Sequence, residues 1–333
     1  MRYVSIILLL VILLCNISCT SNTISDYSLD AEIQLLPWEI ADYRQFQKTP
    51  AWDLAKATFD GDTSIMDEIL SRDPSIIDCK SSNGMTLLMT TITNQNRAPF
   101  FCQLFLDNIY NFAPNESQQI SFRHLLKHGA SVNLINKFGE TALMIACDYD
   151  NIDYVRDLID SGADINYVQC PDSSNNKDRD NQTALLIACK NNRSDMVKLL
   201  IEHGADINFV NCHLESALNF YVRDRDYDMI YYLLNRGVDY SVPTVKVCDL
   251  NLQYMGKKKW QEYEHDTTTI SLAEALRYDY YPLESKEYQK KMKIVQFLKK
   301  RGVDYRKIPI PKGILTEIKN DYPHNWEEYI RNY

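Results

Sequence analysis

The stretches "GETALMIACDYDNIDYVRDLIDSGADIN" (residues 139–166) and "NQTALLIACKNNRSDMVKLLIEHGADIN" (residues 181–208) decide the fold, because they follow nearly the same pattern. In each stretch, Thr is followed by Ala-Leu, then by Ala-Cys and a polar break. A second apolar stripe comes next, and Gly-Ala-Asp-Ile-Asn ends the pattern. A chain that repeats such a pattern is predicted to repeat one structural unit.

The spacing of the glycines supports this interpretation. Gly129 and Gly162 are 33 residues apart, and so are Gly204 and Gly237. A period near 33 is typical of repeat arrays, in which each unit buries its apolar flank against its neighbour.

Each unit is predicted to contain two short antiparallel helices and a projecting turn. Ala142, Leu143 and Ala146 form a narrow apolar face of small residues, which lets a neighbouring helix come close. The second stripe has helical spacing and consists of Ile152, Val155, Leu158 and Ile159. Gly162 follows this stripe, where a left-handed residue can end the helix.

The two segments resemble ankyrin repeats, whose consensus contains Thr-Pro-Leu-His and Gly-Ala-Asp-x-Asn. Here Thr-Ala-Leu-Met and Thr-Ala-Leu-Leu replace the first motif. The resemblance implies an all-α fold, an ankyrin-repeat solenoid of stacked helix-turn-helix units with projecting turns. Because the consensus His braces the turn by a hydrogen bond in that family, its loss predicts softer turns.

The resemblance covers roughly residues 51–305 and predicts about six repeats. Insertions are expected near residues 98–117, 170–180 and 240–269, and the sequence does not predict the structure of the last one. Residues 306–333 are predicted to form a C-terminal cap.

The first 18 residues are predicted to be a signal peptide. Arg2 precedes the apolar run Ile6–Leu14, which is shorter than the roughly 20 residues that span a bilayer. Ser18-Cys19 after this run resembles the lipobox of bacterial lipoproteins, although Asn16 departs from it. The resemblance implies lipidation of Cys19, a tether over residues 19–50 and a place in the bacterial cell envelope. An ordinary cleaved signal or an uncleaved anchor is the alternative.

No sequence motif indicates a catalytic or metal site. His124 and His128 have the i, i+4 spacing of metal ligands, but the glutamate of HExxH is absent, so no metal is predicted. Asp224, Asp226 and Asp228 resemble the start of a calcium loop, but Gly and Glu are missing at the required later positions. The last of these Asp residues is therefore expected to cap a helix.

The remaining composition also argues against several classes of ligand. With a net charge of −9, the chain is not expected to bind nucleic acid. Cys147 and Cys189 occupy the same position in the two segments, so they are predicted to pack in the core. No cofactor and no small-molecule substrate is expected.

The predicted function is that of a membrane-anchored scaffold that binds a protein partner through the concave face and the turn tips. A secreted effector or toxin-neutralising protein without lipid is the alternative, and an enzyme with its site in the insertions is a third. The resemblance to ankyrin repeats places the partner-binding positions in the third to fifth units: Lys137, Phe138, Glu140, Asp148, Tyr149, Gln182, Lys190, Asn191, His213, Glu215, Arg223 and Asp224.

Overall fold

The computed structural model describes residues 43–93, 116–170, 181–241, 245–246, 250 and 268–333. The chain divides into two compact units, Met1–Ile145 and Ala146–Tyr333. The predicted signal peptide, Cys19 and most of the three predicted insertions (98–117, 170–180 and 240–269) lie outside the described residues. Within the described ranges, no helix is long and apolar enough to span a bilayer.

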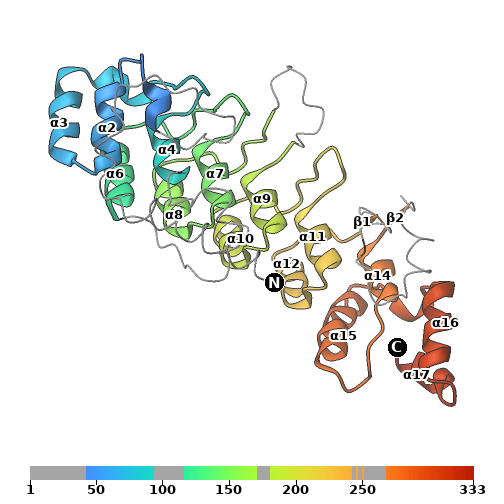
Figure 1. Ribbon diagram of the computed structural model, residues 1–333. Helices are drawn as coiled ribbons and strands as arrows, with labels where there is room; N and C mark the ends of the chain where they lie inside the picture. The colour runs from blue at the N-terminus through green and yellow to red at the C-terminus, as the bar shows by residue number, and fades with distance from the viewer. Residues whose placement is uncertain (1–42, 94–115, 171–180, 242–244, 247–249, 251–267) are drawn as a thin grey trace, which may run out of the picture. The chain divides into compact units, whose positions relative to one another are not determined.

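In the part that the structure describes, the first unit contains two pairs of helices and the start of a third (Figure 1). Its described elements are η1 (Tyr43–Phe46), α2 (Trp52–Asp60), α3 (Thr63–Arg72), η2 (Pro74–Asp78), α4 (Leu87–Thr93) and α6 (Glu116–Lys127). The division between the units falls within α7 (Ala142–Asp148).

Helix α6 closes the first unit because it packs against α2, α3 and α4. Ser121 Oγ donates to the carbonyl of Thr58 at 2.7 Å, and Gln118 Nε2 donates to that of Phe59 at 3.1 Å. Carbonyls in the last turn of a helix have no partner within it. The two polar side chains of α6 therefore satisfy the C-terminal end of α2.

The second unit repeats the same plan three times and ends in two further helices. Its elements are α8 (Ile152–Asp160), α9 (Ala184–Lys190), α10 (Ser194–Glu202), α11 (Ala217–Asp224), α12 (Tyr227–Asn235), β1 (Val245–Lys246), β2 (Thr269–Ile270), α14 (Leu272–Ala275), η4 (Leu276–Tyr278), α15 (Lys286–Lys299), η5 (Tyr305–Lys307), α16 (Lys312–Asp321) and α17 (Trp326–Asn332).

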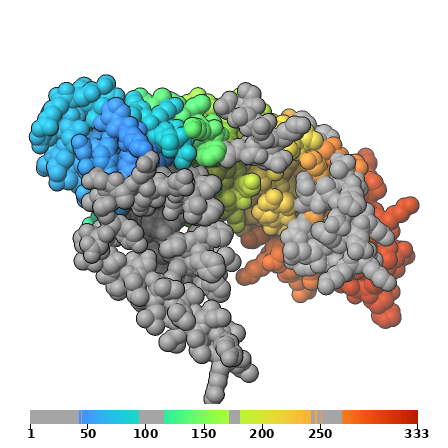
Figure 2. Space-filling view, turned by 45° about the horizontal axis from the view of Figure 1, so that its top comes forward, coloured from blue at the N-terminus to red at the C-terminus, as the bar shows by residue number. Residues whose placement is uncertain are grey.

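In this unit, first helices pack on first helices and second helices on second helices. Helix α9 contacts α11, α8 contacts α10, and α12 contacts α15. The space-filling view shows the colours of residues 146–333 following one another in chain order, so each pair touches its neighbours in sequence (Figure 2). The buried faces contain predicted apolar residues, among them Ala146, Val155 and Leu158. The predicted stacking of helix pairs is confirmed.

The Thr or Ser that opens each repeat caps its first helix. Thr183 Oγ1 accepts from the amide of Leu186, and Ser216 Oγ accepts from that of Asn219, both at 3.3 Å. These bonds satisfy donors that the helix leaves unpaired. The cap of α12 corrects one expectation: Asp226 accepts from the amide of Met229, whereas Asp228 lies inside the first turn.

In this unit, a glycine in the left-handed conformation follows the second helix of each pair. The φ angles are 86° at Gly162, 92° at Gly204, 88° at Gly237 and 88° at Gly302. No atom lies within 4 Å of a Cβ built at any of them. The glycines are therefore required by the backbone conformation and not by crowding.

The Asp-x-Asn that follows Gly162 and Gly204 joins successive repeats. Asn166 Nδ2 donates to the carbonyl of Gly204 at 3.0 Å, and Asn166 Oδ1 accepts from the amide of Asp206 at 2.8 Å. One repeat later, Asn208 Oδ1 accepts from the amide of Asp239 at 2.7 Å. The motif thus adds an inter-repeat ladder of hydrogen bonds to the apolar stacking.

The end of the chain packs around two buried charges. Asp279 accepts from Arg225 Nε at 2.7 Å and from the Tyr227 hydroxyl at 2.7 Å, which joins it to the loop and start of α12. Lys291 is fully buried, donates to the carbonyl of Asp279 at 2.7 Å, and lies 3.8 Å from the ring centre of Tyr333. The C-terminal residue therefore helps to enclose a cation.

Lys291 predicts how stability changes with pH. Burial lowers the pKa of its ammonium group to about 7, whereas a lysine in an unfolded chain has a pKa of about 10.4. Above pH 7 the unfolded chain therefore binds more protons than the folded chain, and the free energy of unfolding rises with pH. Between pH 7 and about 8.5 we expect a gain of about 1–2 kcal/mol, measured by denaturant titration.

Lys291→Met is the control, because methionine fills similar space and stays neutral, so this gain should disappear. Burial raises the pKa of the Cys147 thiol, and it raises that of Cys189 to about 12. Both thiols thus lower stability once the pH exceeds the ordinary thiol pKa of about 8.5, which sets the upper end of the range. An equal gain in both proteins would contradict the role given to Lys291.

Candidate functional site

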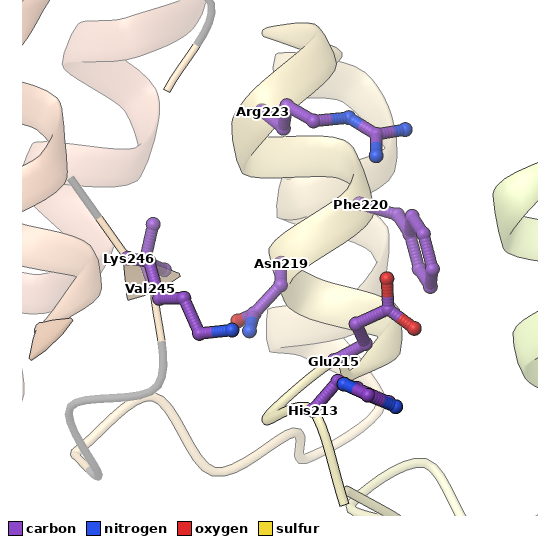
Figure 3. Close-up of a pocket in the computed structure, with 7 residues that line it drawn as sticks. All are labelled: His213, Glu215, Asn219, Phe220, Arg223, Val245 and Lys246. Carbon is purple, nitrogen blue, oxygen red and sulfur yellow. The ribbon is translucent and has the colours of Figure 1, made fainter. Parts of the chain in front are cut away.

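A pocket of about 270 Å³ lies beside helix α11 in the second unit. It is lined by His213, Glu215, Asn219, Phe220, Arg223, Val245 and Lys246 (Figure 3). These residues come from the turn before α11, from α11 itself and from strand β1. The pocket therefore combines a turn tip, a first helix and the segment that follows the fifth repeat.

Asn211 holds the turn that carries His213 and Glu215. Its Oδ1 accepts from the amides of both residues at 2.9 Å, and its Nδ2 donates to Glu215 Oε2 at 2.8 Å. A side chain bonded in this way replaces a backbone turn interaction. Leu214, at the tip, has a φ of 65°. One buried asparagine thus fixes the conformation of the tip.

The turn before α7 in the first unit uses the same arrangement. Asn136 Oδ1 accepts from the amides of Phe138 and Glu140 at 2.8 and 2.9 Å, and Asn136 Nδ2 donates to Glu140 Oε2 at 2.8 Å. The sequence predicted softer turns because the consensus His is missing. In both turns an asparagine before the tip supplies bracing hydrogen bonds, and the softness of the turns stays a prediction.

Helix α11 places Asn219, Phe220 and Arg223 along one wall. Arg223 Nε donates to Asp224 Oδ1 at 2.9 Å, and its guanidinium carbon lies 5.1 Å from the ring centre of Phe220. In Figure 3, Phe220 and Arg223 project to one side of α11, whereas Asn219 lies toward Lys246. Phe220 is buried and Arg223 is half-buried, so the arginine covers the ring and keeps its charge near solvent.

Strand β1 brings Val245 and Lys246 to the pocket. Val245 pairs with Ile270 and Lys246 with Thr269 in a two-stranded antiparallel ladder. Because Ile270 directly precedes the Ser271 cap of α14, the ladder ties β1 to the sixth helix pair. Lys246 and Arg223 then place cationic groups at the pocket, while the Glu215 carboxylate is bonded to Asn211. Such a lining suits a partner's carboxylate or amide group.

One position recurs along the first helices of the second unit. Asp148, Lys190 and Arg223 each lie seven residues after the Thr or Ser that opens their repeat. Asp148 and Lys190 are exposed and Arg223 is half-buried. Asn191, which directly follows Lys190, donates from Nδ2 to Asp148 Oδ1 at 3.0 Å. The row changes from acidic to basic toward the pocket.

Three of the twelve predicted binding residues, His213, Glu215 and Arg223, line the pocket, and Asp224 bonds to one of them. The structure corrects the expectation for Gln182. This residue is 8% exposed, and its backbone carbonyl accepts from the backbone amide of Gln169. Its side chain is therefore unsuited to contact a partner.

The other seven predicted residues lie in both units. Lys137, Phe138 and Glu140 belong to the first unit, where Lys137 is exposed and the other two are half-buried. In the second unit, Asp148 and Lys190 are exposed, and Tyr149 and Asn191 are half-buried. All of these remain predictions as partner contacts.

Four pocket residues were not predicted from the sequence. Asn219 and Phe220 lie on the helix face between two predicted positions, and their helical spacing from Arg223 could have identified them. Val245 and Lys246 fall in the insertion near residues 240–269, which has no repeat register. Only the pairing of β1 with β2 brings them to the pocket.

Exposed apolar side chains accompany the turns of the second unit. Val168, Val210 and Leu214 are 36%, 39% and 42% exposed. Val168 and Val210 precede successive turns at equivalent positions. Scattered apolar residues are common on protein surfaces, but these lie beside the polar positions discussed above and extend the same surface.

Residues that could hold a metal lie elsewhere, in the first unit. Asp67, His124 and His128 bring three ligand atoms within 4.8 Å of one another. The sequence predicted no metal site because only the two histidines are near each other in the chain.

The bracing of the turn by Asn211 can be tested directly. Asn211→Ala removes three hydrogen bonds, so we expect the free energy of unfolding to fall by about 1–2 kcal/mol. Amide hydrogen exchange at His213 and Glu215 should become faster, because these amides lose their acceptor.

Asn235→Ala is the matched control, since that exposed side chain bonds only to the carbonyl of Tyr231 in its own helix. Unchanged exchange at His213 and Glu215 in Asn211→Ala would contradict the bracing role.

Most of this surface lies in a segment of the chain that matches a known protein family. Residues 54–169 and 167–244 match the family model of ankyrin repeats (three copies). Together the matches extend over residues 54–244, which is more than half of the chain. They include α11 and the turn that bears the pocket, whereas Val245 and Lys246 lie just beyond. A comparison with curated proteins finds no match.

Proposed function

Since the chain belongs to the ankyrin repeat family, we propose that it is a scaffold that binds a protein partner through its turns and first helices. The observation that carries this proposal is the pocket beside α11, where a turn, a helix and β1 converge. Ankyrin repeats generally mediate binding to protein partners, and the pocket lies where such contacts are made.

The chemistry of the pocket indicates what the partner presents. Lys246 and Arg223 supply positive charge, and Phe220 supplies an aromatic surface at the base of the arginine. Arginine and aromatic residues are enriched among the side chains that contribute most to binding energy. We therefore propose a partner that inserts an acidic side chain or a carboxyl terminus here, with the row from Asp148 to Arg223 setting its orientation.

Site-specific photocrosslinking tests the partner surface in cells that produce the full chain. A benzophenone amino acid in place of Lys190 or His213 should give a crosslinked product of one defined mass. The control position is Asp195 in α10, whose side chain is 85% exposed and lies on a second helix. It should give no such product.

Arg223→Ala should reduce the yield of the His213 crosslink, because the charge and the cover of Phe220 are lost together. Removing a central arginine of an interface costs about 2 kcal/mol or more, which is roughly a 30-fold loss of affinity. An equal yield at all three crosslinking positions would refute the proposed surface.

We further propose that the scaffold is attached to the bacterial cell envelope by lipid on Cys19. The support is in the sequence: Arg2, the apolar run Ile6–Leu14 and the small residue Ser18 directly before Cys19. Two or three acyl chains at one cysteine would hold a protein stably at a membrane surface. Residues 20–50 would then connect the anchor to the repeats.

Labelling with radioactive palmitate checks the anchor. The wild-type chain should incorporate label and fractionate with membranes, and Cys19→Ser should lose both properties. Cys15→Ser is the matched control and should retain them, because bulky Leu14 precedes Cys15. If Cys19→Ser is still exported and appears outside the cell like the wild type, the secreted alternative replaces the anchored one.

A further inference from the structure

A cluster of three side chains connects helices α3 and α6 in the first unit. His124 Nε2 lies 2.9 Å and His128 Nε2 lies 2.7 Å from the same atom, Asp67 Oδ1. The ring centres of the two histidines are 4.6 Å apart. Two imidazoles from one helix and one carboxylate from another thus converge on one point.

This convergence depends on how the helices pack. His124 lies in the last turn of α6 and His128 directly follows that helix, so the two residues are one turn apart and their rings project from the same face. Asp67 lies 57 residues before His124 and is brought to them because α3 packs against α6. The Asp67 carboxylate supplies a third ligand, which the sequence motif of the two histidines does not contain.

The donor set and its exposure fit a divalent transition metal. Zinc is bound by imidazole nitrogen and carboxylate oxygen at about 2.0–2.2 Å, often with water in a fourth position. The side chains of His124, His128 and Asp67 are 11%, 31% and 57% exposed. The histidines are thus held partly in the protein, while the Asp67 side leaves access for an ion and its water.

Only a small movement separates the present geometry from a coordinated one. Ligand atoms around a tetrahedral zinc lie about 3.3 Å apart, compared with the 2.7 and 2.9 Å of the two hydrogen bonds and with a largest separation of up to 4.8 Å among the three ligand atoms. The Asp67 side chain can rotate and is more than half exposed. Its carboxylate can therefore move outward without disturbing the core.

We propose that Asp67, His124 and His128 form a binding site for Zn²⁺ that joins α3 to α6. An ion bound here connects the second helices of two successive pairs, which otherwise meet only through packing and hydrogen bonds. Because the ligands are assembled only in the folded chain, zinc binding stabilises the first unit. The site is separate from the partner pocket, so each proposal can fail without the other.

Zinc titration of the metal-free full chain, in detergent and in a buffer that does not coordinate metals, tests this proposal. Calorimetry should show one high-affinity Zn²⁺ per chain, and zinc should raise the midpoint of thermal unfolding. Co²⁺ in place of zinc should give the visible absorption of a four-coordinate nitrogen and oxygen site.

His128→Gln and Asp67→Asn should each weaken zinc binding at least 10-fold and abolish the thermal shift. His203→Gln is the matched control, because it removes an exposed histidine outside the cluster and should bind zinc like the wild type. Circular dichroism verifies that each variant is folded.

Two results would overturn the proposal. The first is a wild-type chain that binds no Zn²⁺ at concentrations up to about 100 times the protein concentration. The second is equal binding by the wild type, His128→Gln and Asp67→Asn, which would place the ion at other residues and leave the cluster as a hydrogen-bonded link between the helices.

Discussion

Every other feature of this protein depends on the burial of one helix pair by the next. A single pair has helices of about nine residues or fewer, such as α9 and α10, and helices of this length are unstable alone in water. Stacking removes their apolar faces from water, as the burial of Leu185 and Leu200 shows. The array therefore gains stability from contacts between neighbours in sequence, and its surface features recur with the period of the repeat.

Polar side chains refine this stacking in two places. Asn166 and Asn208 connect successive repeats at the turns after the second helices, and Asn211 fixes the turn before α11. These amides satisfy backbone groups that short helices and tight turns leave without partners. A repeat that lacks the consensus histidine can therefore still brace its tip with side-chain hydrogen bonds. Rigid tips are what a binding surface requires, because less entropy is lost when a partner docks.

The last described helices differ from the middle of the array. There, the apolar flank is covered by α15, α16 and α17, and charged groups enter the interior. Asp279 meets Arg225 and Tyr227 while Lys291 is enclosed by the C-terminal Tyr333. Buried ion pairs contribute less to stability than to the specificity of an arrangement. These charges thus define how the last helices close the array.

The sequence by itself determined the fold class, the helix pairs and the glycines that follow the second helices. It could do so because helical periodicity and Gly at a left-handed position are local requirements. It also placed His213, Glu215 and Arg223, which share a repeat register. Only the tertiary structure decided that Gln182 is buried, that Lys246 joins the pocket, and that Asp67 meets His124 and His128. Each of these depends on contacts between segments distant in the chain, and no local pattern encodes such contacts.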